Sequence, residues 1–331
     1  MSPGVPQSQD APILLAGFDA GQTHTTCRLA TAAGIVLAEG KGPGVGHLSS
    51  PQGEQRFEEA LRESLVRARA RLVDQQAPEG VWPLGAAAVG ASGIEEGSGV
   101  QQQGHQLSAA TLGLRADQVV VTGDERTALE GAFPRGEGIV VISGTGTIAL
   151  GRDRAGHHHR CAGWGWLLDG AGSAMDIGRD ALSLTLRMAD GRHPDGPLRH
   201  ALWQAMGLEL DDPQTPQHIK ARVVAPGFGP AGFAALAPVV ETQAASGDGL
   251  ALGILQRHGE ALVEMVVAVA NRLDLPSPPV CTLGGAILHL ACFREAFGTA
   301  LAVALPSGRW QDPAGDGCAG ALAMAAALRP R

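Results

Sequence analysis

The chain has 331 residues, 44% of them hydrophobic and 18% charged, with a formal net charge of −8 at pH 7. This is the composition of a soluble globular protein long enough for two domains, and it excludes a disordered chain. The acidic balance and the lack of a Lys/Arg-rich run argue against a nucleic-acid partner and against a membrane partner. Five scattered cysteines without a C-x-x-C pair argue against a disulfide scaffold or a zinc site, and with the polar start of the chain they predict a cytoplasmic location.

The first half of the sequence predicts a β-meander followed by alternating strands and helices. Runs of β-favouring residues, bounded by turn residues, predict strands over 13–18, 25–31, 35–39, 86–89 and 118–121. Apolar residues at helical spacing predict helices over 56–73 and near 103–112. A third helix, over 126–132, is expected to begin at Asp124-Glu125.

The second half opens with the same pattern. Strands are expected over 138–142, 147–150 and near 158–161, and the loop Gly144-Thr-Gly-Thr147 follows the first of them as Ala20-Gly-Gln-Thr23 follows the first strand of the chain. The repetition predicts an α/β fold of two related, duplicated lobes that pack around a central cleft. We place the first lobe at 1–122, completed by a C-terminal helix at about 316–331, and the second lobe at 123–315.

The rest of the second half is predicted to be mostly helical. An apolar face from Leu262 to Leu273 indicates a long helix that the prolines of 276–279 end. Further on, a strand over 280–283, a tight turn at Gly284-Gly285, and helices over 287–301 and about 318–328 are expected, and residues 227–232 are predicted to form a loop.

Two Gly/Thr loops are the first candidates for chemistry. Each follows a buried strand, and backbone N–H groups and Thr hydroxyls in such loops can donate to phosphate oxygens. Asp19, at the end of the first strand, is a candidate Mg²⁺ ligand. The alternative is that both loops are ordinary hairpin turns. A Walker A loop is absent from the sequence.

Three further candidates, in two parts of the chain, each leave an alternative open. Asp124 follows the strand over 118–121, where a carboxylate can accept the proton of an attacking hydroxyl, or it can simply cap the next helix. Trp164 and Trp166 stand in a Gly-rich stretch, where indoles can stack on a sugar or fill the core. Asp169 can bind a sugar hydroxyl or cap the helix that starts near Ser173.

Taken together, these residues resemble the BadF/BadG/BcrA/BcrD-type ATPase family and, within it, the N-acetylglucosamine kinase branch. The resemblance runs from Gly17 to about Leu328. Its motifs are Gly17-Phe-Asp-Ala-Gly-Gln-Thr-His-Thr25, Ile142-Ser-Gly-Thr-Gly-Thr147, Gly163-Trp-Gly165, Ala171-Gly-Ser173, Ile177-Gly-Arg-Asp-Ala181, Asp190-Gly-Arg192 and Leu283-Gly-Gly-Ala286.

The resemblance implies a two-lobed actin-like ATPase (ribonuclease H-like) fold, with ATP and Mg²⁺ as cofactors. It implies that Asp19 helps to hold Mg²⁺ and that Asp124 is the base that takes the proton from the sugar's 6-hydroxyl. The phosphate loops are then formed by Gly21, Thr23, Gly144, Thr145 and Gly146, the adenosine is bordered by Gly284, Gly285 and Ala286, and the sugar lies beside His47, Thr145, Gly163, Trp164 and Asp169.

Three departures from the family pattern concern the sugar more than the nucleotide. Ala20 and Gln22 replace two glycines of the first loop, and Gly46, not Asn, precedes His47. The family's Gly-Asp-Glu-Gly-Ser becomes Asp169-Gly-Ala-Gly-Ser173, which removes the sugar-binding acid from its usual place. The fold and the ATP site are expected to survive these changes.

The sequence therefore predicts an ATP-dependent kinase for the 6-hydroxyl of an amino sugar, N-acetylglucosamine first, working as a homodimer on a small-molecule sugar. Three alternatives stay open. They are a kinase for glucosamine or another hexose, an ATPase that activates a partner enzyme, and a non-catalytic sugar- or ATP-binding protein of the same fold.

Overall fold

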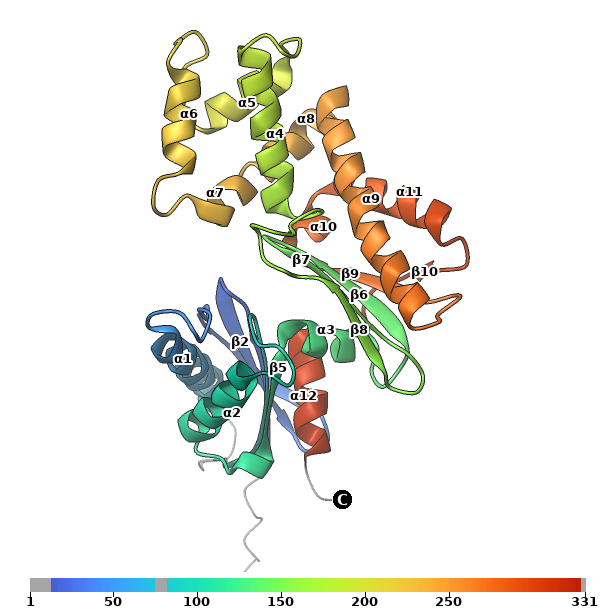
Figure 1. Ribbon diagram of the computed structural model, residues 1–331. Coiled ribbons are helices and arrows are strands. Elements are labelled where there is room, and N and C mark those ends of the chain that lie inside the picture. The colour runs from blue at the N-terminus through green and yellow to red at the C-terminus, as the bar shows by residue number, and fades with distance from the viewer. Residues whose placement is uncertain (1–12, 75–81, 329–331) are drawn as a thin grey trace, which may run out of the picture. The chain divides into compact units, whose positions relative to one another are not determined.

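The computed structural model describes residues 13–74 and 82–328 (Figure 1). The chain separates into two compact units, which we call unit 1 (Met1–Arg135 with Pro313–Arg331) and unit 2 (Gly136–Asp312). Within the described residues, no helix has the length and the apolar character needed to cross a membrane. The five cysteines are free thiols.

Unit 1 is built on a five-stranded sheet with the order β3-β2-β1-β4-β5. The strands β1 (Leu14–Ala20), β2 (His24–Thr31) and β3 (Val36–Pro43) form the antiparallel meander that the sequence predicts. The strands β4 (Leu84–Ala91) and β5 (Val119–Gly123) then run parallel to β1. Because β1 lies between neighbours on both sides and under helices on both faces, it is apolar along most of its length.

Helices cover the two faces of this sheet (Figure 1). On one face α1 (Gly53–Asp74) and α2 (Gly99–Leu112) pack on the side chains of Leu14, Ala16 and Phe18. A single 3₁₀ turn, η1 (Ala116–Gln118), leads from α2 into β5. On the other face α12 (Gly317–Ala327) packs on Leu15, and a Cβ on Gly17 would lie 2.7 Å from the backbone oxygen of Cys318. The C-terminal helix is thus part of unit 1.

Unit 2 repeats the same sheet. Its order is β10-β9-β6-β7-β8, in which β6 (Gly138–Ser143), β7 (Thr147–Arg152) and β8 (His158–Ala162) form an antiparallel meander. The strands β9 (Pro279–Leu283) and β10 (Arg309–Trp310) run parallel to β6. Strand for strand this is the arrangement of unit 1, so the predicted duplication of a meander-led lobe is confirmed.

The helices of unit 2 lie beside this sheet and extend beyond it (Figure 1). The longest, α9 (Gly249–Arg272), packs on the sheet through one apolar face, and the core beside it includes Trp203, whose Nε1 donates to Thr185 Oγ1 at 3.0 Å. The others are α4 (Ala174–Ala189), α5 (Pro197–Ala205), α6 (Thr215–Val223), α7 (Gly229–Ala234), α8 (Ala237–Ala245), α10 (Gly285–His289) and α11 (Ala291–Ala304).

Two predicted elements of unit 2 differ from the structure. The loop expected over 227–232 is wrong, because α7 begins at Gly229 and has Pro230 in its first turn, where a fixed φ favours a helix. The single helix expected over 287–301 is divided into α10 and α11 by the extended backbone of Leu290. Apolar periodicity persists across that break, so the sequence pattern does not reveal it.

The helix α3 (Asp124–Ala132) moves the boundary between the units. It packs on α12 within unit 1, and the division falls after Arg135 instead of after residue 122 as the sequence analysis placed it. The two helices approach closely because they meet at glycines: a Cβ on Gly320 would lie 1.9 Å from the backbone oxygen of Thr127. A Cβ on Gly131 would lie 2.0 Å from the backbone oxygen of Asp316. Backbone-to-backbone packing of this kind ties α3 to unit 1.

Candidate functional site

The carboxyl ends of three parallel strands meet at one edge of the sheet in unit 1. In the strand register Asp19 of β1 lies beside Gly90 of β4, and Gly90 lies beside Thr122 of β5. Asp124 follows β5 directly, as the first residue of α3. A Cβ on Gly90 would lie 2.1 Å from Thr127 Oγ1, so the glycine lets α3 approach this edge. The edge where open α/β sheets bind ligands therefore carries both predicted carboxylates.

Asp19 is held in an environment that disfavours its charge. Its pKa is raised to about 6, first by burial and then by the negative charges of Asp124 and Asp316. The carboxylate lies against the start of α12, where a Cβ on Gly317 would be 2.9 Å from Asp19 Cγ. These shifts show that Asp19, Asp124 and Asp316 share one acidic region within unit 1.

Asp124 is not the cap of α3, so that alternative reading of the sequence is wrong. The capping position belongs to Gly123, which has no side chain to donate or accept. The pKa of Asp124 is raised to about 7, first by burial and then by the charge of the neighbouring Glu125 and a side-chain hydrogen bond with it. A carboxylate with a pKa near neutrality is suited to accept a proton during a reaction.

The acidic region is compatible with a single Mg²⁺ bound mainly through water. Mg²⁺ commonly uses one or two carboxylates and keeps several water ligands. Bringing a cation to Asp19 would relieve the repulsion that Asp124 and Asp316 exert on it. Over residues 13–74 and 82–328, no group of three His, Cys, Asp or Glu side chains is arranged to hold a metal alone. Asp19 therefore fits the ion as a partial ligand.

The first Gly/Thr loop and the loop of His47 are tied together. The N–H of Gly21 donates to the oxygen of His24 at 3.1 Å and closes the turn, which leaves Thr23 exposed. The N–H of Val45 donates to the oxygen of Gly21 at 3.0 Å. The imidazole of His47 lies over the turn after β4, since a Cβ on Gly93 would be 2.4 Å from His47 Nδ1. Unit 1 thus places a phosphate-loop candidate and a sugar-loop candidate side by side.

The second Gly/Thr loop is closed on itself and attached to the loop before α4. The N–H of Gly144 donates to the oxygen of Gly146 at 2.9 Å, and Thr145 at the tip is exposed. Ser143 Oγ donates to the oxygen of Gly172 at 2.6 Å, and the N–H of Ala174 donates to the oxygen of Gly144 at 2.8 Å. The second Gly/Thr loop and the loop before α4 are therefore joined through their backbones. Such fixed backbone is what a binding surface for phosphate oxygens requires.

The Gly284-Gly285-Ala286 turn packs directly on this loop. Gly284 has φ +96°, and a Cβ there would lie 2.5 Å from the backbone oxygen of Ser143. A Cβ on Gly144 would in turn be 3.9 Å from the backbone nitrogen of Gly285. Both predicted nucleotide motifs of unit 2 thus meet at the carboxyl ends of β6 and β9, which is the position that Asp19 occupies in unit 1.

The tryptophan loop of unit 2 is exposed. Trp164 is 63% exposed and Trp166 40%, so the alternative that these indoles fill the core is wrong. The Arg160 guanidinium stacks 5.0 Å from the Trp164 ring centroid, and Gly163 has φ +77°, which shapes the loop. Asp169 does not cap α4, because Ser173 Oγ accepts the N–H of Asp176 at 3.0 Å instead. Trp164 and Asp169 remain available to a ligand.

Comparison with known proteins agrees with this geometry. The model of the BadF/BadG/BcrA/BcrD ATPase family matches residues 16–325. The chain belongs to this family. Membership in an ATPase family implies ATP as a ligand, and the match covers both Gly/Thr loops and the Gly284-Gly285 turn.

Individual relatives cover nearly the whole chain. An N-acetylmuramic acid/N-acetylglucosamine kinase of Clostridium acetobutylicum is 27% identical over 93% of this chain and 97% of its own length. The structure of a candidate N-acetylglucosamine kinase from Chromobacterium violaceum has a TM-score of 0.77 at 26% identity and covers 95% of this chain and 99% of its own. The ROK hexokinase of Thermus thermophilus, at 14% identity, has a TM-score of 0.55 and covers 95% of this chain and 97% of its own. The predicted actin-like ATPase fold is therefore confirmed.

Sequence reasoning missed two side chains of this family member that adjoin the predicted site. Asp316 could have been recognised as the cap of the last helix, because Asp is favoured there and Gly317 starts the helix. His258 accepts the N–H of Gly172 at 3.0 Å. Gly172 and His258 are 86 positions apart in the chain, so no local pattern could have indicated the contact.

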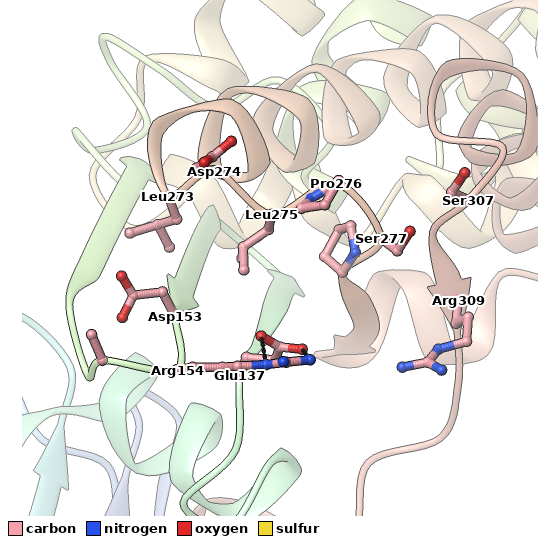
Figure 2. A pocket seen from close by; sticks show the side chains of 12 residues that line it. Glu137, Asp153, Arg154, Leu273, Asp274, Leu275, Pro276, Ser277, Ser307 and Arg309 are labelled. Carbon is pink, nitrogen blue, oxygen red and sulfur yellow. Dashed lines mark hydrogen bonds and ion pairs between the residues drawn. The ribbon is translucent and has the colours of Figure 1, made fainter.

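A cavity of unit 2 lies away from these loops. Figure 2 shows this cavity of about 800 Å³, where Arg154 forms two hydrogen bonds, 2.8 and 2.9 Å, with the Glu137 carboxylate. Its lining includes Glu137 and Pro278, which directly precede β6 and β9. It therefore lies at the amino ends of these parallel strands, whereas ligands of α/β sheets bind at the carboxyl ends.

Proposed function

We propose that the protein is an ATP-dependent kinase that phosphorylates the 6-hydroxyl of an amino sugar, with N-acetylglucosamine as the first candidate. The observation that carries this proposal is Asp124, a carboxylate at the carboxyl end of β5 whose pKa burial raises to about 7. Such a group suits an acceptor that must lose a proton, as a sugar hydroxyl does. The relatives named as kinases for N-acetylglucosamine or N-acetylmuramic acid support the same class of acceptor.

The proposed roles follow the positions of the residues. Asp124 accepts the hydroxyl proton as the oxygen attacks the terminal phosphorus of ATP. Backbone N–H groups and hydroxyls of the two Gly/Thr loops, with Thr23 and Thr145 at their exposed parts, stabilise the phosphoryl oxygens. Asp19 would help to hold Mg²⁺, which offsets negative charge on the phosphates when it is bound.

The sugar contacts are proposed for exposed or half-buried side chains. His47 would contact the sugar from the loop attached to Gly21, and Trp164 with Gly163 would stack on a sugar face. Asp169 would bind a ring hydroxyl in place of the acid that Gly170 and Ala171 lack. These positions decide which sugar is accepted, so the acceptor needs a direct test.

A panel of sugars with coupled detection of ADP tests the proposal. N-acetylglucosamine, N-acetylmuramic acid, glucosamine and glucose are offered with Mg²⁺ and ATP, and the 6-deoxy analogue of the best acceptor is the matched control. We expect sugar-dependent ADP with an N-acetylated sugar and none with its 6-deoxy analogue, because the attacking oxygen is missing.

Other outcomes separate the alternatives. ADP formed equally without sugar favours an ATPase that activates a partner, and ATP binding without turnover favours a non-catalytic protein. ADP formed with glucosamine or glucose but not with the N-acetylated sugars keeps the kinase and changes its substrate. The proposed homodimer is tested separately by sedimentation, where a single species of monomer mass would overturn it.

A further inference from the structure

A buried histidine in unit 2 contacts the backbone of the candidate binding loops. His258 on α9 is 6% exposed, and its Nδ1 accepts the N–H of Gly172 at 3.0 Å. The carbonyl oxygen of the same glycine accepts a hydrogen bond from Ser143 Oγ at 2.6 Å. Both backbone groups of Gly172 are therefore fixed, one by helix α9 and the other by the last residue of β6.

The hydrogen bond fixes the protonation pattern of the ring. A nitrogen that accepts from an N–H group carries no proton, so the proton of the neutral imidazole lies on Nε2. Nε2 faces Oδ2 of Asp180 on α4 at 3.3 Å, a contact too poorly aligned to be a full hydrogen bond. Interaction with His258 holds the pKa of Asp180 below its usual value. The ring is thus oriented between a carboxylate and a backbone N–H.

The surroundings allow Gly172 little freedom. Its φ is +82°, and a Cβ would lie 2.3 Å from Leu262 Cδ2, so only glycine brings the loop this close to α9. The preceding residue, Ala171, is also held, because Thr147 Oγ1 donates to its backbone oxygen at 3.1 Å. The segment 170–173 therefore lies between α9 and the loop Gly144–Thr147 and is hydrogen-bonded on both sides.

We propose that His258 is a positioning residue, which as a neutral imidazole holds Gly172 and, through Ser143, the phosphate loop at Gly144–Thr147. This inference rests on the proposed function only in taking that loop to bind phosphate. Misplacement of a binding loop by about 1 Å can cost about 10²-fold in rate, so a single buried hydrogen bond behind the loop can matter to turnover. The charged groups near the ring or its partner Asp180 are Asp176 and Arg179 on α4 and Arg257 on α9.

Two polar substitutions distinguish the two ring nitrogens. His258→Asn places an amide oxygen near the position of Nδ1 and keeps an acceptor for Gly172. His258→Gln reaches the position of Nε2 and leaves the Gly172 N–H without its acceptor. His218→Leu is the matched control, because His218 also faces a carboxylate, Asp212 at 3.7 Å, but is half exposed on α6.

The measurements are the dissociation constant for Mg·ATP, kcat/KM for the best sugar, the thermal midpoint, and amide exchange of the peptide that contains Gly172. We expect His258→Gln to weaken Mg·ATP binding or kcat/KM by about tenfold or more and to speed exchange at Gly172, while His258→Asn stays within about threefold of wild type. His218→Leu should match wild type in all four.

Several results would overturn the proposal. A folded His258→Gln protein with wild-type nucleotide affinity and turnover, or one no worse than His258→Asn, removes the positioning role and leaves a packing residue. Fast exchange of the Gly172 amide in the wild-type protein overturns it without any variant. Because Mg·ATP affinity is measured without sugar, a wild type that phosphorylates no sugar would overturn the kinase proposal and leave this one to be judged separately.

Discussion

The guanidinium of Arg28 on β2 forms two parallel hydrogen bonds, both 2.7 Å long, with the carboxylate of Asp316, the cap of α12. These residues are 288 positions apart. Arg28 also donates to Glu39 of β3 at 2.8 and 3.1 Å, so one side chain joins the meander to the C-terminal helix. Burial tends to raise the pKa of Asp316, and the bonds from Arg28 and from the N–H of Ala319 outweigh it and lower that pKa. These bonds fix the start of α12 to the meander of unit 1.

Replacing Arg28 should weaken the attachment of α12 to the meander. In Arg28→Ala, the carboxylates of Glu39 and Asp316 lose their common partner, and we expect the free energy of unfolding to fall by about 1–3 kcal/mol. Urea unfolding followed by circular dichroism measures the change. We also expect a modest fall in kcat, because the positive charge of Arg28 offsets the negative charge around Asp19.

The control for Arg28 has the same pair geometry in water. Arg115 makes two hydrogen bonds of 3.0 Å to Asp117, and both side chains are largely exposed. Water and salt screen exposed ion pairs, so Arg115→Ala should be nearly neutral. Equal losses for the two variants would show that the Arg28 bonds do not stabilise unit 1 specifically.

Much of the fold was predictable because it depends on local patterns. The β-branched and alternating runs that end in Gly/Thr loops located both meanders, and their repetition revealed the duplicated lobe. The boundary between the units was not predictable from such patterns. It depends on Gly131 and Gly320, whose missing side chains let α3 and α12 touch by their backbones, and nothing in the local sequence links them.

The site shows the same division between local and distant information. The sequence points to Asp19 and Asp124 as candidates because each follows a strand, and parallel strands bring their ends together. The capping alternative for Asp124 could not be settled from sequence, because Gly123 and Asp124 are both acceptable caps. In unit 1 Asp316 approaches Asp19 by tertiary contact alone, and in unit 2 His258 reaches Gly172 in the same way. The exposure of Trp164 depends on the loop shape that Gly163 and Gly165 allow.

The contact between α3 and α12 gives a second prediction. In Gly320→Val, the new side chain would overlap the backbone oxygen of Thr127, which cannot move without displacing α3. We expect a loss of about 3 kcal/mol or more, or failure to fold, because overpacking against backbone is poorly relieved. Gly99→Val at the exposed start of α2, where a Cβ would meet nothing within 4 Å, is the control. Similar thermal midpoints for the two variants would contradict the close packing.

Loss of the proposed base gives a third prediction. Asp124→Asn keeps the shape of the side chain and removes its ability to take a proton, so kcat for the best sugar should fall by about 10²–10⁴-fold. The dissociation constant for Mg·ATP should change little, because the phosphate loops are intact. Asp117→Asn, on the exposed turn η1, serves as the control. Wild-type turnover in Asp124→Asn would remove Asp124 from the mechanism.

The pH dependence of turnover gives a fourth prediction. Burial first, and Glu125 second, raise the pKa of Asp124 to about 7, and only the ionised form accepts a proton. The rate at saturating substrates should therefore fall on the acid side, to roughly a tenth of its plateau one pH unit below that pKa. The residual rate of Asp124→Asn should lack this acid limb. A wild-type profile that stays flat from pH 8 to pH 5 would contradict the assignment.

The same raised pKa predicts an effect on stability with the opposite trend. An unfolded Asp titrates near 3.9, so between that pH and about 7 the folded protein binds more protons than the unfolded one, and stability decreases as pH rises through this window. Asp124→Asn has no charge to desolvate, so its thermal midpoint should gain on wild type between pH 5 and pH 8, measured without Mg²⁺. Asp195→Asn is the control: its hydrogen bond from Arg199 lowers the pKa of Asp195 to about 2, so its contribution is constant over that range. If the thermal midpoint of Asp124→Asn exceeds that of wild type by the same amount at pH 5 and at pH 8, the surroundings of Asp124 do not raise its pKa.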